Sequence, residues 1–228
     1  MARRTDVDQR PGLSRAAIVA EALRIVDAEG IEAVSMRRVA DRFGTGPASL
    51  YAHVANREEL LLLVADEVMS GVRRPPVDPK RWRAQLLDLL TDLRAVLTAH
   101  GDIAAMSIGR IPMHPHTLDV AEHIIALLIA GGLDRTTIAL AADLLPLYVV
   151  SVAHEEGVEH VGDRRNGEDY HLAVQAHWAT LSHERYPTIF SLMPELFTAG
   201  DGDERFRFGL EVLLDGLVAR GCPKRGRK

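Results

Sequence analysis

The chain has 228 residues, a formal net charge of −5, 47% hydrophobic and 26% charged residues, and a single cysteine. These ordinary values for a globular protein exclude the disordered, collagen-like and fibrous classes. The length accommodates one compact domain, or a small domain and a medium one. The lone Cys222 excludes an internal disulfide framework and a cysteine-based zinc cluster, and its place beyond the last predicted helix argues against redox sensing.

The charge is unevenly distributed. Residues 1–60 balance nine basic against nine acidic side chains, and residues 224–228 carry four basic side chains and no acidic one. The remaining segment, 61–223, holds 14 basic and 23 acidic residues and therefore has a net charge of −9. Taken as a whole, the acidic chain argues against a nucleic-acid partner. Taken by segment, only the large C-terminal part would be repelled by DNA.

No export signal or membrane span is expected. Residues 1–11 are polar and charged, with no apolar run behind them. The most apolar stretch, 138–153, contains Asp143 and Pro146 and is shorter than the roughly 20 residues of a membrane span. We expect a buried helix there, kinked at Pro146, in a cytoplasmic protein with no membrane partner.

Apolar residues recur at helical spacing, and no segment shows the alternation of a half-buried strand, which predicts an all-α fold. Ser14 and Asn56 are expected helix caps, because their side chains can accept a hydrogen bond from a free backbone N–H. Residues 73–79 form the clearest break, since three prolines in five residues cannot continue a helix. Residues 158–167 are expected to be a polar loop. The predicted helices cover 15–29, a short segment after Ser35, 47–53, 57–73, 82–99, 103–109, 116–130, 135–156, 169–181 and 204–219.

The two short helices on either side of Gly44-Thr45-Gly46 form a candidate helix-turn-helix. The second of them is short and has no bulky charge at its start, as an N-terminal end that enters the major groove requires. Leu50 is expected to face inward and the other residues of 47–53 outward. Spacing alone also fits an ordinary three-helix bundle.

Three segments are more specific: Ser-Met-Arg-Arg-Val-Ala-Asp-Arg-Phe-Gly at 35–44, Pro-Ala-Ser-Leu-Tyr-Ala-His-Val at 47–54, and Asn-Arg-Glu-Glu-Leu-Leu at 56–61. They resemble the DNA-binding domain of the TetR family of transcriptional regulators. The remainder is similar to the tetracycline-repressor-type C-terminal domain, through Trp82, His114-Pro115 and the segment 206–217. The resemblance implies a homodimeric, ligand-responsive repressor on a palindromic operator, released by a small molecule in the C-terminal core. The resemblance does not distinguish a repressor from an activator of transcription.

The resemblance also implies a division of the chain. We expect a flexible arm over 1–13 and a three-helix DNA-binding domain with its connecting helix over 14–73. A larger helical-bundle domain for ligand binding and dimerisation is expected over 74–220, followed by a basic tail over 221–228.

Residue by residue, the resemblance implies a DNA-binding set. Ser35 and Arg37 open the second helix near phosphates and base edges, and a bidentate Arg37 would prefer guanine. Arg57 matches a cation that clamps phosphate, and Tyr51 and His53 match phosphate-contacting positions. The reading helix itself carries Pro47, Ala48, Ser49, Tyr51, Ala52 and His53.

Two departures and two alternatives bear on this set. Gly46 stands where many relatives carry Ser or Thr, and Ala52 is small where relatives often carry a large residue, so methyl contacts and Arg37 would carry more of the readout. Alternatively, Arg37, Arg38 and Arg42 form a solvated helix face. Tyr51 can also be read as a half-buried aromatic of the bundle.

The expected ligand pocket is apolar with a few polar groups. Asp143 interrupts the apolar helix and shares a face with Leu147 and His154. Because a buried carboxylate needs a partner, Asp143 is expected to face either a ligand or a hydrogen bond between helices or at the dimer interface. The candidate ligand-binding residues, most of them implied by the resemblance, are His100, Met106, Arg110, Asp143, Leu147, Tyr148 and Trp178.

The resemblance implies dimerisation through helices near 135–156 and 204–219. The expected apolar seam consists of Val212, Leu213, Leu217 and Val218.

Other classes of function find less support. His116, Asp119 and His123 share a helical face near His114, and such side chains can bind zinc or iron. Their spacing is loose, however, and we predict no metal and no cofactor.

An enzyme is the main rival to a transcriptional regulator. However, no strand precedes Gly44-Thr45-Gly46, no G-x-S-x-G elbow occurs, and no zincin motif follows His154-Glu155. The third class is an architectural DNA-binding protein without a ligand.

Overall fold

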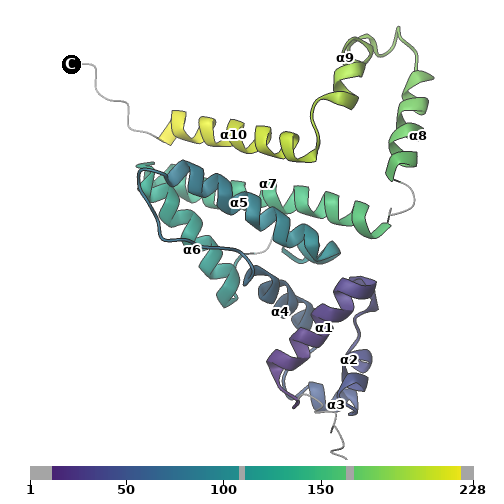
Figure 1. Ribbon diagram of the computed structural model, residues 1–228, viewed down its shortest axis with the longest axis vertical. Helices are drawn as coiled ribbons and strands as arrows, with labels where there is room; N and C mark the ends of the chain where they lie inside the picture. Colours follow the sequence, from purple (N-terminus) through teal and green to yellow (C-terminus); the bar gives the residue numbers. More distant parts are fainter. Residues whose placement is uncertain (1–11, 108–110, 163–166, 222–228) are drawn as a thin grey trace, which may run out of the picture.

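The computed structural model describes residues 12–107, 111–162 and 167–221, and within these ranges it contains helices and no strand, as predicted (Figure 1). The α-helices of the N-terminal part are α1 (Arg15–Glu29), α2 (Met36–Arg42), α3 (Pro47–Leu50) and α4 (Arg57–Met69), with a 3₁₀ helix η1 (Ile31–Ala33) after α1. The later elements are α5 (Trp82–Ala99), the 3₁₀ helix η2 (Gly101–Ser107), α6 (Pro115–Ala130), α7 (Arg135–Gly162), α8 (Gly167–Ala179), α9 (Pro187–Thr198) and α10 (Gly202–Gly221).

Capping side chains fix the starts of the N-terminal helices. The Ser14 hydroxyl accepts from the Ala17 N–H at 3.2 Å, and the Asn56 side chain accepts from the Glu59 N–H at 2.8 Å. Both caps are as predicted, and each satisfies one of the free N–H groups at a helix start. Ser35 caps α2 in the same way, by accepting from the Arg38 N–H at 3.2 Å.

Helices α1 to α3 form a small bundle on the first half of α4. Its core includes Ile18, Ile25 and Leu50, which are fully or almost fully buried. Helix α4 then leaves this bundle and packs against α5, α6 and η2 of the larger domain. Figure 1 shows α4 between the two groups of helices, so it is the segment that joins them.

The larger domain is built around α5 and α7, which pack along each other, with η2, α6 and α10 against α7. Leu90 and Leu145 are fully buried in its core. Helix α6 ends against α5 at Gly131, where a Cβ atom would lie 2.8 Å from the Trp82 ring. A larger residue at 131 would therefore displace Trp82.

One described segment, Arg135–Gly157 of α7, is long and apolar enough to cross a membrane by length and composition, with a mean hydropathy of 1.7. In the fold it is a packed helix of the bundle, in contact with α5, α6, α10 and η2. Pro146 lies inside this helix, as predicted.

Several helices begin or end at other residues than the sequence predicted. Helix α7 continues to Gly162, into the segment expected to be a polar loop, and α4 stops at Met69 instead of 73. Of the helix expected over 103–109, residues 103–107 belong to the 3₁₀ helix Gly101–Ser107, and residues 108–109 lie outside the described residues. The reading helix ends at Leu50, and residues 51–53 continue as a turn.

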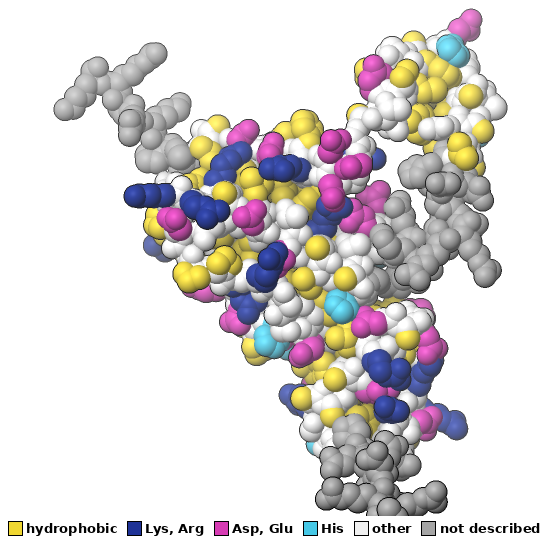
Figure 2. All heavy atoms as spheres, viewed as in Figure 1, with side chains coloured by type: hydrophobic (Ala, Val, Ile, Leu, Met, Phe, Trp, Pro, Cys, Tyr) yellow, Lys and Arg dark blue, Asp and Glu magenta, His cyan; other side chains and the backbone are white. Residues whose placement is uncertain are grey.

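Helix α9 was not predicted. Its Pro187 occupies the first turn, where the missing N–H costs nothing, and Pro194 lies inside the helix. Figure 1 shows α8 and α9 projecting from the bundle as an arm, and α9 has no buried residue. The arm is held by its own aromatic contacts, such as Trp178 edge-on to Phe197 with ring centroids 5.3 Å apart. In Figure 2 hydrophobic side chains gather on this arm.

Candidate nucleic-acid interface and ligand cavity

The candidate reading surface is the outer face of α2 and α3. Helix α2 buries Met36, Val39 and Ala40, and α3 buries Leu50, which confirms the predicted inward orientation of Leu50. The turn between the helices is tied to α3 by a 2.7 Å hydrogen bond between the Thr45 and Ser49 hydroxyls. Burial of these apolar groups leaves Ser35, Arg37, Ala48, Tyr51 and Ala52 exposed, with Pro47, Ser49 and His53 half-buried.

Arg37 differs from the other cations of this bundle. Arg38 pairs with Glu29, and Arg42 pairs with Glu21 at 3.6 Å. Over residues 12–60, Arg37 is the arginine without a hydrogen bond or ion pair. Its guanidinium is therefore available to a partner outside the chain without breaking a contact to any described residue.

Arg57 makes contacts that the resemblance did not indicate. Its Nε donates to the Val34 carbonyl at 2.7 Å and its Nη2 to the Ile31 carbonyl at 2.8 Å. The guanidinium thus satisfies carbonyls in and after η1, and two of its donor groups are used inside the bundle. The expected phosphate clamp would have to use the remaining N–H groups.

The sequence did not predict a contact between Arg15 and the reading segment. The Nε of Arg15 donates to the backbone carbonyl of His53 at 2.9 Å, which joins the start of α1 to the end of the reading segment. Tyr51, next to this anchored turn, keeps 53% of its surface exposed, which excludes the alternative of a half-buried bundle aromatic. No sequence pattern marks the Arg15 contact, because the two residues are 38 positions apart.

A cavity of about 410 Å³ lies in the larger domain. Residues of α4, α5, α6 and α7 line it, together with Ser107, Ile111 and Pro112. Most of the lining is apolar, such as Met69, Leu93 and Ile124. Of the predicted ligand-binding residues, Asp143 and Leu147 line this cavity. Its size falls within the range of about 300–1,000 Å³ that is usual for small-molecule sites.

Four predicted ligand residues lie elsewhere. His100 Nδ1 is 2.7 Å from an Asp27 carboxylate oxygen, so this side chain joins the two domains. The Tyr148 hydroxyl donates to the Phe206 carbonyl at 3.2 Å, and Trp178 packs in the arm. Met106 packs against the core without lining the cavity. Arg110 is outside the described residues.

Asp143 was expected to face a ligand, or a hydrogen bond between helices or at the dimer interface, and no described residue of the same chain supplies such a hydrogen bond. Asp143 lies on α7 and is exposed. No described residue gives its carboxylate a hydrogen bond or an ion pair. His154, predicted on the same face, is half-buried, and its Nδ1 has no partner within the described part of the chain.

Asp66 is a buried carboxylate that sequence reasoning missed. It is 6% exposed and lies on α4. Its oxygens accept hydrogen bonds from the Thr117 N–H and hydroxyl, each at 2.8 Å, and from the His116 N–H at 3.4 Å. Thr117 also lines the cavity, so the first turn of α6 contacts both the cavity and α4.

The histidines considered for metal binding do not converge. Asp119 is 3.7 Å from Arg74, and the described residues contain no group of three or more side chains arranged to hold a metal ion. His123 is half-buried, and its Nε2 has no described partner. Burial, with a smaller contribution from Arg74, lowers the pKa of His123.

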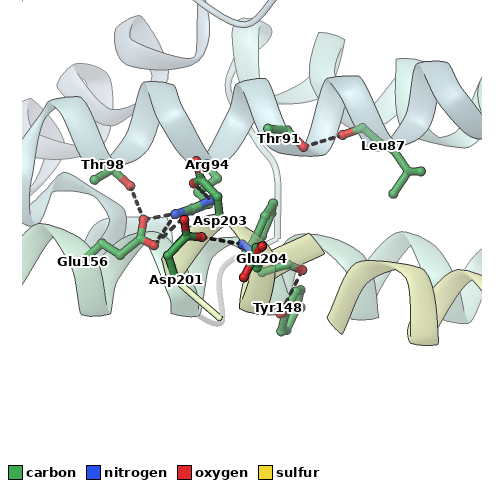
Figure 3. A network of polar contacts seen from close by, with 10 residues as sticks. Leu87, Thr91, Arg94, Thr98, Tyr148, Glu156, Asp201, Asp203 and Glu204 are labelled. Atoms are coloured by element: carbon green, nitrogen blue, oxygen red, sulfur yellow. Dashed lines mark hydrogen bonds and ion pairs between the residues drawn. The ribbon is translucent and has the colours of Figure 1, made fainter. Parts of the chain in front are cut away.

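A charged network joins α5, α7 and α10 (Figure 3). Arg94 donates to Glu156 at 2.8 Å and to Asp203 at 2.7 Å, and the Thr98 hydroxyl donates to the same Glu156 at 3.1 Å. The Arg94 guanidinium lies over the Phe206 ring, with its central carbon Cζ 4.7 Å from the ring centroid. These contacts hold α10 on the bundle.

The expected dimer seam is only partly on the surface. Leu217 is 8% exposed because it packs inside its own chain, whereas Val212 is 53% exposed. Other apolar side chains on these two helices are open to solvent, and they are Leu140, Leu144 and Leu147 on α7 and Phe208 on α10.

Comparisons with known proteins cover both domains. Residues 75–220 match the model described as "Tetracyclin repressor-like, C-terminal domain", and residues 18–64 match "Bacterial regulatory proteins, tetR family". The HTH-type transcriptional repressor DrrR1 of Streptomyces coeruleorubidus is 32% identical over 98% of this chain and 84% of its own length. Tetracycline repressor protein class C of Escherichia coli is 25% identical over 90% of each chain.

Among solved structures, the TetR family protein ActR of Streptomyces coelicolor in complex with actinorhodin superposes with a TM-score of 0.83. It is 37% identical, over 92% of this chain and 97% of ActR. Apo ActR superposes with a TM-score of 0.81, at 38% identity. The helix-turn-helix, the larger helical domain and these matches together show that the chain belongs to the tetR family of bacterial regulatory proteins, which are ligand-responsive transcriptional regulators.

Proposed function

We propose that this protein is a repressor that binds a palindromic operator as a homodimer and is released when a small molecule enters the α4–α7 cavity. One observation carries the proposal. Helix α4 begins at the Asn56 cap in the reading domain and reaches the cavity with Met69 at its other end. A ligand that displaces this end of α4 would therefore reorient the reading surface.

For DNA contact we propose the outer face of α2 and α3 with the turn that follows. Arg37 reads a base edge, since no described residue gives it a hydrogen bond or an ion pair, and Tyr51 contacts phosphate. The supporting residues are Ser35, Pro47, Ala48, Ser49, Ala52 and His53, with the remaining N–H groups of Arg57. Residues 14–73 act as the DNA-binding domain and 74–220 as the effector and dimerisation domain, flanked by an arm over 1–13 and a basic tail over 221–228.

For the dimer we propose the exposed apolar faces of α7 and α10. Leu140 and Leu144 of one helix and Phe208 and Val212 of the other supply the contact. Apolar side chains exposed together on packed helices favour burial against a second copy, and a two-fold dimer would present two reading domains to the two halves of a palindrome.

For the effector we propose a small molecule of drug size. The structure of ActR in complex with actinorhodin supports this, because a relative with the same fold has been solved with a bound compound. Family membership and the arrangement of the helices support a regulator without catalytic activity, acting in the cytoplasm where its DNA partner is found.

The test is a selection of DNA from a random library by the full-length protein, followed by footprinting. We expect a palindrome, with affinity that falls as salt rises because phosphate contacts release counterions. Compounds are then screened for release of that DNA. Binding without sequence preference, or a palindrome that no compound releases, would support the architectural alternative instead.

A further inference from the structure

The lining of the cavity is almost entirely apolar. Its residues with polar side chains are Ser107, Thr117 and Asp143, and no Lys, Arg or His is among the described residues that line it. The Thr117 hydroxyl already donates to Asp66. Asp143 therefore carries the only formal charge of the described lining.

Within the described part of the chain, no cation compensates this charge. No described residue gives Asp143 a hydrogen bond or an ion pair. Cations on flanking segments are engaged elsewhere: Arg74 with Asp119, and Arg94 with Glu156 and Asp203. A carboxylate beside an apolar cavity is costly to desolvate without a cation, so an apolar ligand that covers Asp143 without pairing with it would be disfavoured.

The surrounding domain adds to the same field. Residues 61–223 carry 14 basic and 23 acidic residues, so an approaching cation is attracted and an anion repelled. The carboxylate of Asp143 and the net negative charge of the domain thus both favour a positively charged ligand.

We propose that this cavity is selective for amphiphilic cations, that is, for an effector with a drug-sized apolar body and a protonated amine that pairs with Asp143. This inference rests on the proposed effector site, but it concerns binding alone and not release of DNA. It also assigns Asp143 to the ligand rather than to a dimer contact.

The test uses three fluorescent probes that share three fused rings and differ in charge. They are 9-(aminomethyl)anthracene as the cation, 9-(hydroxymethyl)anthracene as the neutral probe and anthracene-9-carboxylate as the anion. Each is titrated into the full-length protein in the absence of DNA. We expect the amine to bind about tenfold more tightly than the alcohol, which corresponds to a partly desolvated ion pair, and the carboxylate to bind most weakly.

The Asp143→Asn variant should bring the affinity for the amine to within about twofold of that for the alcohol. Glu155→Gln is the matched control, because Glu155 is an exposed carboxylate on the same helix that does not line the cavity. It should keep the preference. Ala121→Phe, which fills the lining on α6, should weaken the binding of all three probes and so place them in the cavity.

Three results would overturn the proposal: no saturable binding of the amine, equal affinity for amine and alcohol in the wild type, or a preference that survives Asp143→Asn. Arg110, outside the described residues, is tested with Arg110→Ala. If the preference appears only in that variant, Arg110 neutralises Asp143 and the proposal is wrong. Because DNA is absent, failure of the amine preference is distinct from failure of the repressor function, which the operator assay measures.

Discussion

The carboxylate of Asp66 accepts hydrogen bonds from both the backbone N–H and the hydroxyl of Thr117, each at 2.8 Å. Asp66 is buried on α4, the helix that leads to the reading domain, and Thr117 is in the first turn of α6 and lines the cavity. A negative group at a helix N-terminus is also favoured by the helix dipole. This contact is therefore a direct mechanical link between the cavity and α4.

We predict that Asp66→Ala destabilises the protein by about 1–3 kcal/mol, because the part-buried donors of His116 and Thr117 on α6 lose their acceptor. Urea unfolding followed by circular dichroism measures this. Glu67→Ala, a neighbouring exposed carboxylate on α4, serves as the control and should change stability by less than about 0.5 kcal/mol. Equal effects of the two substitutions would show that the contact contributes nothing specific.

Arg37→Ala should relax sequence specificity. Loss of a bidentate base contact costs about 1–3 kcal/mol for the preferred base, so affinity for the selected operator should fall by about tenfold or more, with a smaller loss on random DNA. Arg38→Ala is the comparison, since Arg38 is paired with Glu29. If Arg37→Ala weakens binding to all sequences equally, Arg37 contacts phosphate only.

Tyr51→Ala should weaken binding to operator and random DNA by the same factor, because phosphate contacts carry no sequence information. Fluorescence anisotropy on both DNAs measures the ratio. A loss confined to the operator would mean that the exposed Tyr51 ring reads bases instead.

Phe208→Lys should shift the protein from dimer to monomer in analytical ultracentrifugation, because it places a charge in the proposed apolar contact between copies. Ile129→Lys is matched to it, since Ile129 is also an exposed apolar residue, 61% exposed, on α6 outside that contact. A protein that remains dimeric with Phe208→Lys would contradict the assignment of α10.

Stability should fall as the pH drops below about 6.5, in part because of His123. Burial lowers the pKa of this imidazole in the folded state, so the unfolded chain binds more protons once the pH falls through the ordinary histidine pKa, and the loss levels off below the folded pKa. His123→Gln should reduce the decrease in melting temperature between pH 7.5 and 5.5. An unchanged pH profile would show that His123 does not contribute.

The sequence predicts those parts of the fold that depend on local chemistry. The Ser14 and Asn56 side chains mark the starts of α1 and α4, because a cap acts on an N–H two or three residues away. Helix α9 was not predicted, and it contains two prolines, Pro187 in the first turn and Pro194 inside the helix, although proline is locally unfavourable inside a helix. The continuation of α7 to Gly162 was missed because polar residues there suggested a loop.

The candidate site could be predicted from the sequence only in part, because it depends on contacts between residues that are far apart in the chain. The links from Asp66 to Thr117 and from Arg15 to His53 span 51 and 38 positions, and no local pattern marks either. The ligand residues taken from the resemblance illustrate the same limit. Asp143 and Leu147 line the cavity, whereas His100 pairs with Asp27 between the domains.

The most direct measurement is the titration of a selected palindromic operator with the full-length protein, alongside a version in which one half-site is scrambled. Both operators are followed by fluorescence anisotropy. A homodimer on a palindrome should bind as two subunits per operator and lose at least about tenfold in affinity when one half-site is scrambled, in line with the roughly 1–3 kcal/mol for each mismatched base pair. Equal affinity for the intact and scrambled operators would contradict it.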